Sequence, residues 1–191
     1  MKRILLLLAV LSLNSCSLIF EAADISVRRS KEVSTSDQLA GDGFTVRPPE
    51  SGLYPNYGIP FKGGVTLRPT STGFDGLVYY VSPFVSATAR TPDEAMHEWN
   101  SIWIKQGARV EVVEKSRTVF SGLAATRCTG WIAKGSEEHA IAFLVVKRDS
   151  DFLVIGHGNA NRFGKERAKM IAKAKSDLGK LIQGTRLALR P

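Results

Sequence analysis

Three histidines, His97, His139 and His157, are the side chains best suited to bind a metal or act as a general base in this 191-residue chain. Zinc sites place their ligands at short fixed spacings such as His-Glu-x-x-His, and no two of these histidines have such a spacing. The hairpin expected over residues 140–157 puts His157 opposite Ala142, well away from His139. We therefore expect no metal site, no catalytic residue and no cofactor.

A glycine-rich segment, residues 158–166, is similar to a phosphate-binding loop because it follows a predicted strand and opens a predicted helix. It has five residues between its glycines where the P-loop has four, and a glutamate where the P-loop has Ser or Thr. The segment therefore predicts a strand-to-helix turn, with Asn159 or Asn161 near the helix cap. Cys128 lies in an apolar stretch where no motif supplies a base, which predicts a buried, inert thiol.

The N-terminus has the pattern of an export signal. Lys2 and Arg3 precede an apolar run, residues 4–13, which as a helix would be about 15 Å long, half of the hydrocarbon thickness. The run therefore predicts a signal peptide, residues 1–15, and not a membrane span. The segment that ends at Cys16 resembles a bacterial lipoprotein signal, whose cysteine is acylated and becomes the first residue of the mature protein.

An ordinary signal peptide without lipid is the alternative. It needs small residues at the first and third positions before the cut, and cuts after either alanine of the 22–23 pair put Phe20 or Glu21 at the third position. We therefore expect lipidation at Cys16. Ser17, in place of Asp, favours an outer-membrane lipoprotein that faces the periplasm, by resemblance to Gram-negative lipoproteins.

Charge and composition divide the remaining chain. Removal of residues 1–15 lowers the formal net charge from +8 to +6, a balance that favours anionic partners or simply a solvated surface. Nucleic acid is excluded as a partner because the protein is exported. Residues 16–42 have few large apolar side chains and predict a flexible tether that begins at the lipidated cysteine, and residues 43–191 predict one folded domain.

Turn residues and apolar periodicity predict the elements of that domain. Thr91, Pro92 and Glu94 form a capping box that starts a helix, whose apolar face includes Trp99 and which ends at Gly107. The short connections after it force antiparallel hairpins, and two strands that are apolar on both faces require cover on both sides. The predicted strands are 44–47, 65–68, 77–85, 109–120, 124–133, 140–147 and 152–157.

A final helix, predicted over residues 162–183, carries both an apolar stripe and a basic face. The stripe consists of Phe163, Ile171, Ala174, Leu178, Leu181 and Ile182. Lys165, Lys169 and Lys173 recur every four residues and share one face opposite the stripe. That face is either a solvated surface or a possible docking face for an acidic partner or membrane head groups.

The segment from Phe120 to Arg127 carries a family resemblance. Gly122, Leu123, Ala125 and Arg127 match a Gly-Leu-x-Ala-x-Arg segment of the PsbP-like superfamily, and the order of elements from Thr91 to Leu187 is similar to it. The resemblance implies an α+β fold, an α/β/α sandwich in which helices cover both faces of a twisted antiparallel sheet. It also implies a protein that binds partners rather than a catalyst; the metal ligands of some photosynthetic members have no match here.

These observations together favour a lipid-anchored, non-enzymatic accessory or binding protein of the bacterial cell envelope. Its expected partners are the membrane, through the lipid anchor, and an envelope protein or an anionic envelope component. A small-molecule-binding protein or a hydrolase on the same fold is the alternative. A concave pocket with clustered titratable groups would favour that alternative.

Overall fold

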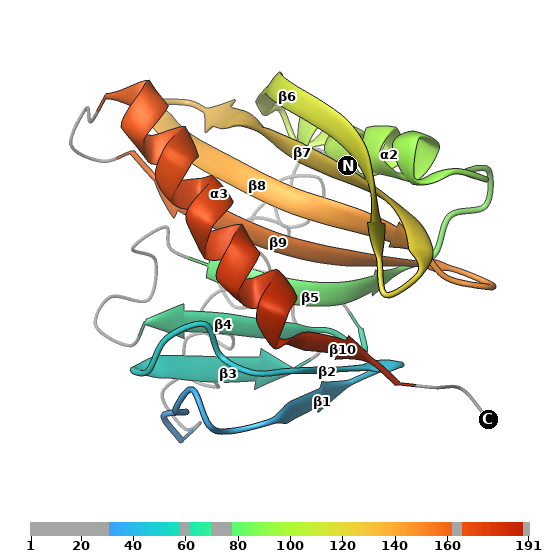
Figure 1. The fold of residues 1–191 in the computed structure, drawn as a ribbon. Coiled ribbons are helices and arrows are strands. Elements are labelled where there is room, and N and C mark those ends of the chain that lie inside the picture. The colour runs from blue at the N-terminus through green and yellow to red at the C-terminus, as the bar shows by residue number, and fades with distance from the viewer. Residues whose placement is uncertain (1–30, 58–61, 70–77, 162–165, 189–191) are drawn as a thin grey trace, which may run out of the picture.

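The computed structural model describes residues 31–57, 62–69, 78–161 and 166–188 (Figure 1). The predicted signal peptide, the predicted lipidation site Cys16 and the docking-face residue Lys165 lie outside the described residues. Within these ranges, no helix combines the length and apolar character needed to cross a membrane.

Seven antiparallel strands form the main sheet, in the order β3-β4-β5-β9-β8-β7-β6 (Figure 1). The hairpins β6–β7, β7–β8 and β8–β9 are joined by the short turns that the sequence predicts, and His157 pairs with Ala142 as expected. The strands are β3 (Leu53–Tyr57), β4 (Val65–Pro69), β5 (Val78–Phe84), β6 (Arg109–Phe120), β7 (Leu123–Lys134), β8 (Glu137–Lys147) and β9 (Phe152–Ala160).

One helix covers each face of this sheet, which confirms the predicted α+β sandwich. Helix α2 (Pro92–Lys105) starts at the predicted capping box, where Thr91 Oγ1 accepts from the Glu94 N–H at 3.3 Å. Its Trp99 is buried against Tyr80 and Phe84 in one core. Helix α3 (Arg167–Gly184) crosses the opposite face diagonally, and its apolar stripe closes the second core (Figure 1).

A second, three-stranded sheet has the order β1-β2-β10. Its strands are β1 (Leu39–Gly41), β2 (Phe44–Val46) and β10 (Thr185–Leu187), and β10 follows α3 directly. Val33 and Leu39 are buried in the core, so residues 33–42 belong to the folded domain, and their assignment to the tether is wrong. The sequence predicts β2 as the strand 44–47 but does not predict β1 or β10. Three residues are too few to show a period of two, and β10 pairs with β2 from the far end of the chain.

The β6–β7 hairpin has two local features that set its geometry. Ser121 and Gly122 have φ values of 51° and 82°, which is the type I′ turn that suits the twist of a two-residue hairpin. A bulge interrupts the pairing between Val112 and Glu114. Gly130 is required beside this bulge, because a Cβ there would lie 2.1 Å from the backbone oxygen of Glu111.

Candidate functional site

A cluster of titratable side chains lies between α3 and the main sheet. Asp177 of α3 accepts a hydrogen bond from Lys173 Nζ at 2.5 Å and another from Lys180 Nζ at 3.3 Å. His157 of β9 is fully buried, and its Nε2 lies 3.5 Å from Asp177 Oδ2. The Tyr79 ring packs against the imidazole, with the ring centroids 4.6 Å apart. The sequence places all five residues on predicted elements, and helical spacing accounts for the two lysine contacts with Asp177. It gives no sign that His157 and Tyr79 join them.

Burial sets the protonation state of His157. Loss of solvent lowers its pKa to about 4, an effect that outweighs the attraction of the Asp177 carboxylate for an imidazolium. Lys173 and Lys180 add to the lowering of the His157 pKa, because both already neutralise Asp177 and repel a further positive charge. The imidazole is therefore neutral at pH 7.

The two neighbours of His157 are also perturbed. Burial acts to raise the pKa of Asp177, but the hydrogen bond from Lys173 and the nearby positive charges hold that pKa below its usual value. Burial, with the charges of Asp177 and Glu50, raises the pKa of Tyr79, whose hydroxyl donates to Glu50 Oε1 at 3.2 Å. Asp177 is thus ionised and Tyr79 is neutral at pH 7.

A histidine beside a carboxylate is the arrangement that general base catalysis uses. Here the histidine has no exposed surface and the Asp177 side chain is 3% exposed, so no substrate reaches them while α3 lies on the sheet. Lys173 and Lys180 contact Asp177 within α3, one turn before and one turn after it, and their side chains are about half exposed. The cluster therefore neutralises a carboxylate that is buried where α3 packs on the sheet.

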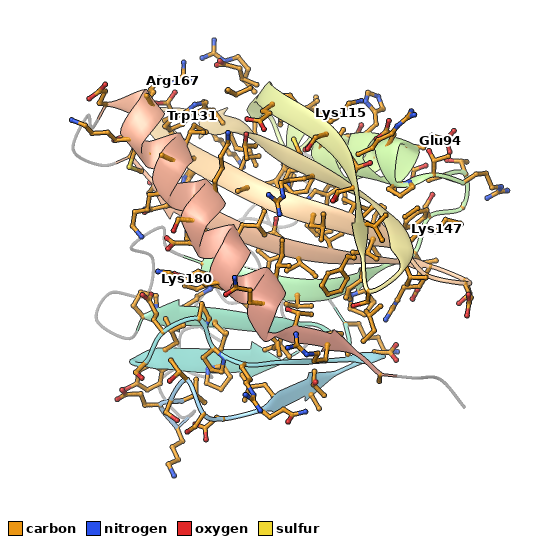
Figure 2. All side chains as sticks on the ribbon, in the orientation of Figure 1. Glu94, Lys115, Trp131, Lys147, Arg167 and Lys180 are labelled. Carbon is orange, nitrogen blue, oxygen red and sulfur yellow. The ribbon has the colours of Figure 1, made fainter. Side chains whose placement is uncertain are left out.

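The predicted docking face is only partly free. Lys169 is exposed and pairs with Glu166 one turn earlier, at 2.9 Å. Lys173 is committed to the buried Asp177, as described above. Lys180 lies further along α3, toward β10 (Figure 2), and contacts the same carboxylate, so two cations of α3 neutralise a buried carboxylate of the same helix.

Further cations of α3 pair with carboxylates of β6 and β8. Arg167 Nη2 lies 2.7 Å from Glu111 Oε2 and 3.4 Å from Glu138 Oε1, and its guanidinium lies over the Trp131 ring, 4.5 Å from the ring centroid (Figure 2). Lys175 pairs with Glu114. Glu111, Glu114 and Glu138 thus neutralise cations of α3 that have no partner within the helix sequence.

The other face of β6 has the opposite charge and contacts α2. Lys115 Nζ lies 3.7 Å from Asp93 Oδ2, and Arg117 Nη2 lies 3.2 Å from the same oxygen. Asp93 also accepts from Thr126 Oγ1 at 2.5 Å, which is the main reason that its pKa is lowered. Each face of this edge strand therefore complements the charge of the helix above it.

The remaining candidate residues are apart from one another. His97 is exposed on α2, and His139 Nε2 lies 3.5 Å from Glu137 Oε2 at the start of β8. Cys128 is fully buried, and burial raises the pKa of its thiol to about 11, as expected of an inert cysteine. No three His, Cys, Asp or Glu residues of the described ranges are grouped as metal ligands would be.

The glycine-rich segment after β9 differs from its prediction. Asn159 lies within β9, which runs to Ala160, and Glu166 occupies the N-cap position of α3 without a side-chain capping bond. The prediction that Asn159 or Asn161 lies near the cap is therefore wrong, because the cap is Glu166. The strand continues further than its apolar residues because the His139–Ala160 pairing with β8 extends the ladder into polar sequence.

Comparison with known proteins identifies the fold. No protein-family model matches the chain, and no curated protein is significantly similar to it in sequence. Cyanobacterial PsbP (CyanoP) from Synechocystis sp. PCC 6803 superposes with a TM-score of 0.56 at 11% identity, over 81% of this chain and 94% of CyanoP. The Ran-binding protein Mog1p of Saccharomyces cerevisiae superposes with a TM-score of 0.53 at 14% identity, over 83% of this chain and 95% of Mog1p. The chain therefore has the PsbP-like fold that its sequence resembles.

Proposed function

We propose that this chain is a non-enzymatic binding protein of the bacterial cell envelope, anchored to the membrane by a lipid on Cys16. The observation that carries the binding function is the position of the titratable cluster. His157 and Asp177 are enclosed between α3 and the sheet, where no substrate reaches them. The exposed surface, with charged faces on α3 and β6, is then the part of the domain that contacts other molecules.

The fold gives further support without defining a partner. Mog1p, which shares this fold, is a Ran-binding protein by name, so the sandwich can present a protein-binding surface. A hydrolase or small-molecule-binding protein remains the second candidate, and the His157–Asp177 pair is the observation in its favour. It would require α3 to move off the sheet.

The anchor is tested by Cys16→Ala. We expect this variant to lose labelling by a radioactive or clickable fatty acid and to leave the membrane fraction, because stable anchoring depends on the acyl chains. Cys128→Ala is the matched control and should be labelled like the wild type. Membrane-bound Cys16→Ala would refute the lipid anchor, even if the binding function stands.

The binding function is tested by crosslinking in intact cells, followed by purification under denaturing conditions. We expect defined crosslinked species that also form when the wild-type and Cys16→Ala proteins are mixed with isolated envelopes. Hydrolysis of generic ester, peptide or glycoside substrates that is lost in His157→Gln would instead establish the second candidate. If no crosslinked species forms either in intact cells or with isolated envelopes, the proposed binding function is refuted.

The face formed by Lys165, Lys169 and Lys173 is a proposed docking surface for anionic head groups. Lys169→Glu changes only an exposed pair within α3, so folding should be preserved. Lys173→Glu would place a second carboxylate beside Asp177 and is unsuited to the test. We expect Lys169→Glu to weaken co-sedimentation with phosphatidylglycerol vesicles at low salt, and salt to weaken the wild type in parallel. Equal sedimentation of the two proteins would make the face a solvated surface.

A further inference from the structure

Strand β6 is an open edge of the main sheet. It is the last strand in the order, and only β7 pairs with it among the described residues. The opposite edge, β3, is partly covered because the Val33 N–H donates to the Leu53 carbonyl at 2.9 Å. An open edge is a template for the addition of another strand. β6 is therefore the place where an extended segment can join this sheet.

The turn determines which backbone groups of β6 face outward. In a two-residue hairpin the flanking residues, here Phe120 and Leu123, bond each other, and bonded and non-bonded pairs alternate from that point. The pairs that include Lys115, Arg117 and Val119 are non-bonded, and their N–H and C=O groups point away from β7. These three residues offer the hydrogen bonds that a new strand would use.

The side chains of the same residues lie on the face that carries α2. Arg117 is 86% exposed at its side chain and Val119 is 68% exposed. Lys115 and Arg117 share one carboxylate, that of Asp93. The edge therefore presents two adjacent cations with one partner between them, followed by an exposed apolar residue.

This charge pattern selects the occupant. Two copies of β6 could pair antiparallel about a two-fold axis. If that axis passes through or between Lys115 and Arg117, each of these cations or one of them faces a cation of the other copy. Like charges directly opposite each other destabilise a sheet, whereas opposite charges stabilise it. A second copy is therefore disfavoured, and a strand with acidic residues at alternate positions is favoured.

We propose that β6 is a docking edge for an extended segment of a partner protein that carries acidic side chains at alternate positions. The inference rests on the proposed binding function and specifies its surface and the chemistry of the partner. The segment would hydrogen-bond to the backbone of Lys115, Arg117 and Val119, with its acidic side chains beside the two cations.

The probe is a peptide of sequence Val-Thr-Glu-Thr-Glu-Thr-Val, which reads the same in both directions and matches Val113–Val119 in length. Its control replaces both glutamates by lysine. Fluorescence anisotropy with the full-length protein in detergent at low salt should show that the acidic peptide binds at least about tenfold more tightly than the lysine peptide. The reason is that each glutamate pairs with a cation of β6, whereas each lysine is repelled by one. Amide hydrogen exchange at Lys115, Arg117 and Val119 should slow when it binds.

Two variants separate backbone pairing from charge. Arg117→Pro removes an N–H that points outward and makes no hydrogen bond to β7, so this variant should abolish binding. Arg117→Gln keeps the N–H and removes the charge, so it should only weaken binding. Arg127→Gln, on the neighbouring strand and the opposite face of the sheet, is the matched control and should bind like the wild type. Circular dichroism verifies that each variant is folded, and Arg117→Gln alone still decides the role of the charge.

Equal affinity for the two peptides, or protection of amides outside β6, would overturn the proposal. A dimer of the free protein that Arg117→Pro dissociates would also overturn it, because the occupant would be a second copy. If wild type and Arg117→Pro crosslink to the same envelope protein, the binding function stands and this edge is not its site. If neither crosslinks to any protein, the binding function itself fails.

Discussion

His157 makes the stability of this protein depend on acidity in a defined direction. Its pKa is about 4 in the folded state, against about 6.5 in an unfolded chain. The unfolded state therefore takes up a proton first as the pH falls. The free energy of unfolding contributed by this residue is complete above pH 6.5 and is lost as the pH falls toward 4.

The size of the effect follows from the two pKa values. Their difference of about 2.5 corresponds to about 3 kcal/mol at 1.36 kcal/mol per unit. The attraction of Asp177 for an imidazolium does not reverse the sign, because Lys173 and Lys180 already occupy that carboxylate. Asp177 has its own lowered pKa and loses its contribution only below the range in which His157 titrates.

Urea unfolding followed by tryptophan fluorescence from pH 8 to pH 4 measures this contribution. We expect the wild type to lose about 3 kcal/mol more than His157→Phe over this range, since phenylalanine keeps the ring contact with Tyr79 and cannot titrate. His139→Gln, which changes a histidine whose side chain is 30% exposed, is the control and should follow the wild type. A wild type that instead gains stability between pH 8 and pH 6 would show that His157 is a cation paired with Asp177, and the reasoning would be refuted.

Three substitutions test the packing. Trp99→Ala should lower the free energy of unfolding by about 3–5 kcal/mol, because Trp99 is 1% exposed; an unchanged melting temperature with altered ligand binding would make it part of a site. Gly130→Ala should cost about 1–3 kcal/mol by forcing a Cβ against the Glu111 backbone, and calorimetry checks this. Arg148→Ala should cost about 3–5 kcal/mol by breaking a buried pair with Asp151, and urea unfolding that matches the wild type would contradict it.

The sequence alone determined the elements whose signals are local. The capping box at Thr91 starts α2 because both of its hydrogen bonds join residues three apart. The hairpins from residue 109 onward follow from turn residues and strand length, and β6 has the predicted bounds. A helix on each face of the sheet followed from strands that are apolar on both sides. The cap and the hairpins are predictable because their deciding contacts are local, and the two helix layers because burial of an apolar face needs no particular partner.

Only the tertiary structure decided which charges meet. By a strict period of two, Glu111 and Glu114 would lie on opposite faces of β6, and the bulge between Val112 and Glu114 brings both to the face under α3. Asp177 is buried on α3 beside the apolar stripe. Lys173 and Lys180 lie within one turn of it on the same helix, but His157, which faces it across the interface, is twenty residues away in the sequence. Such pairings depend on how elements pack, and a linear pattern holds no information about the partner across the interface.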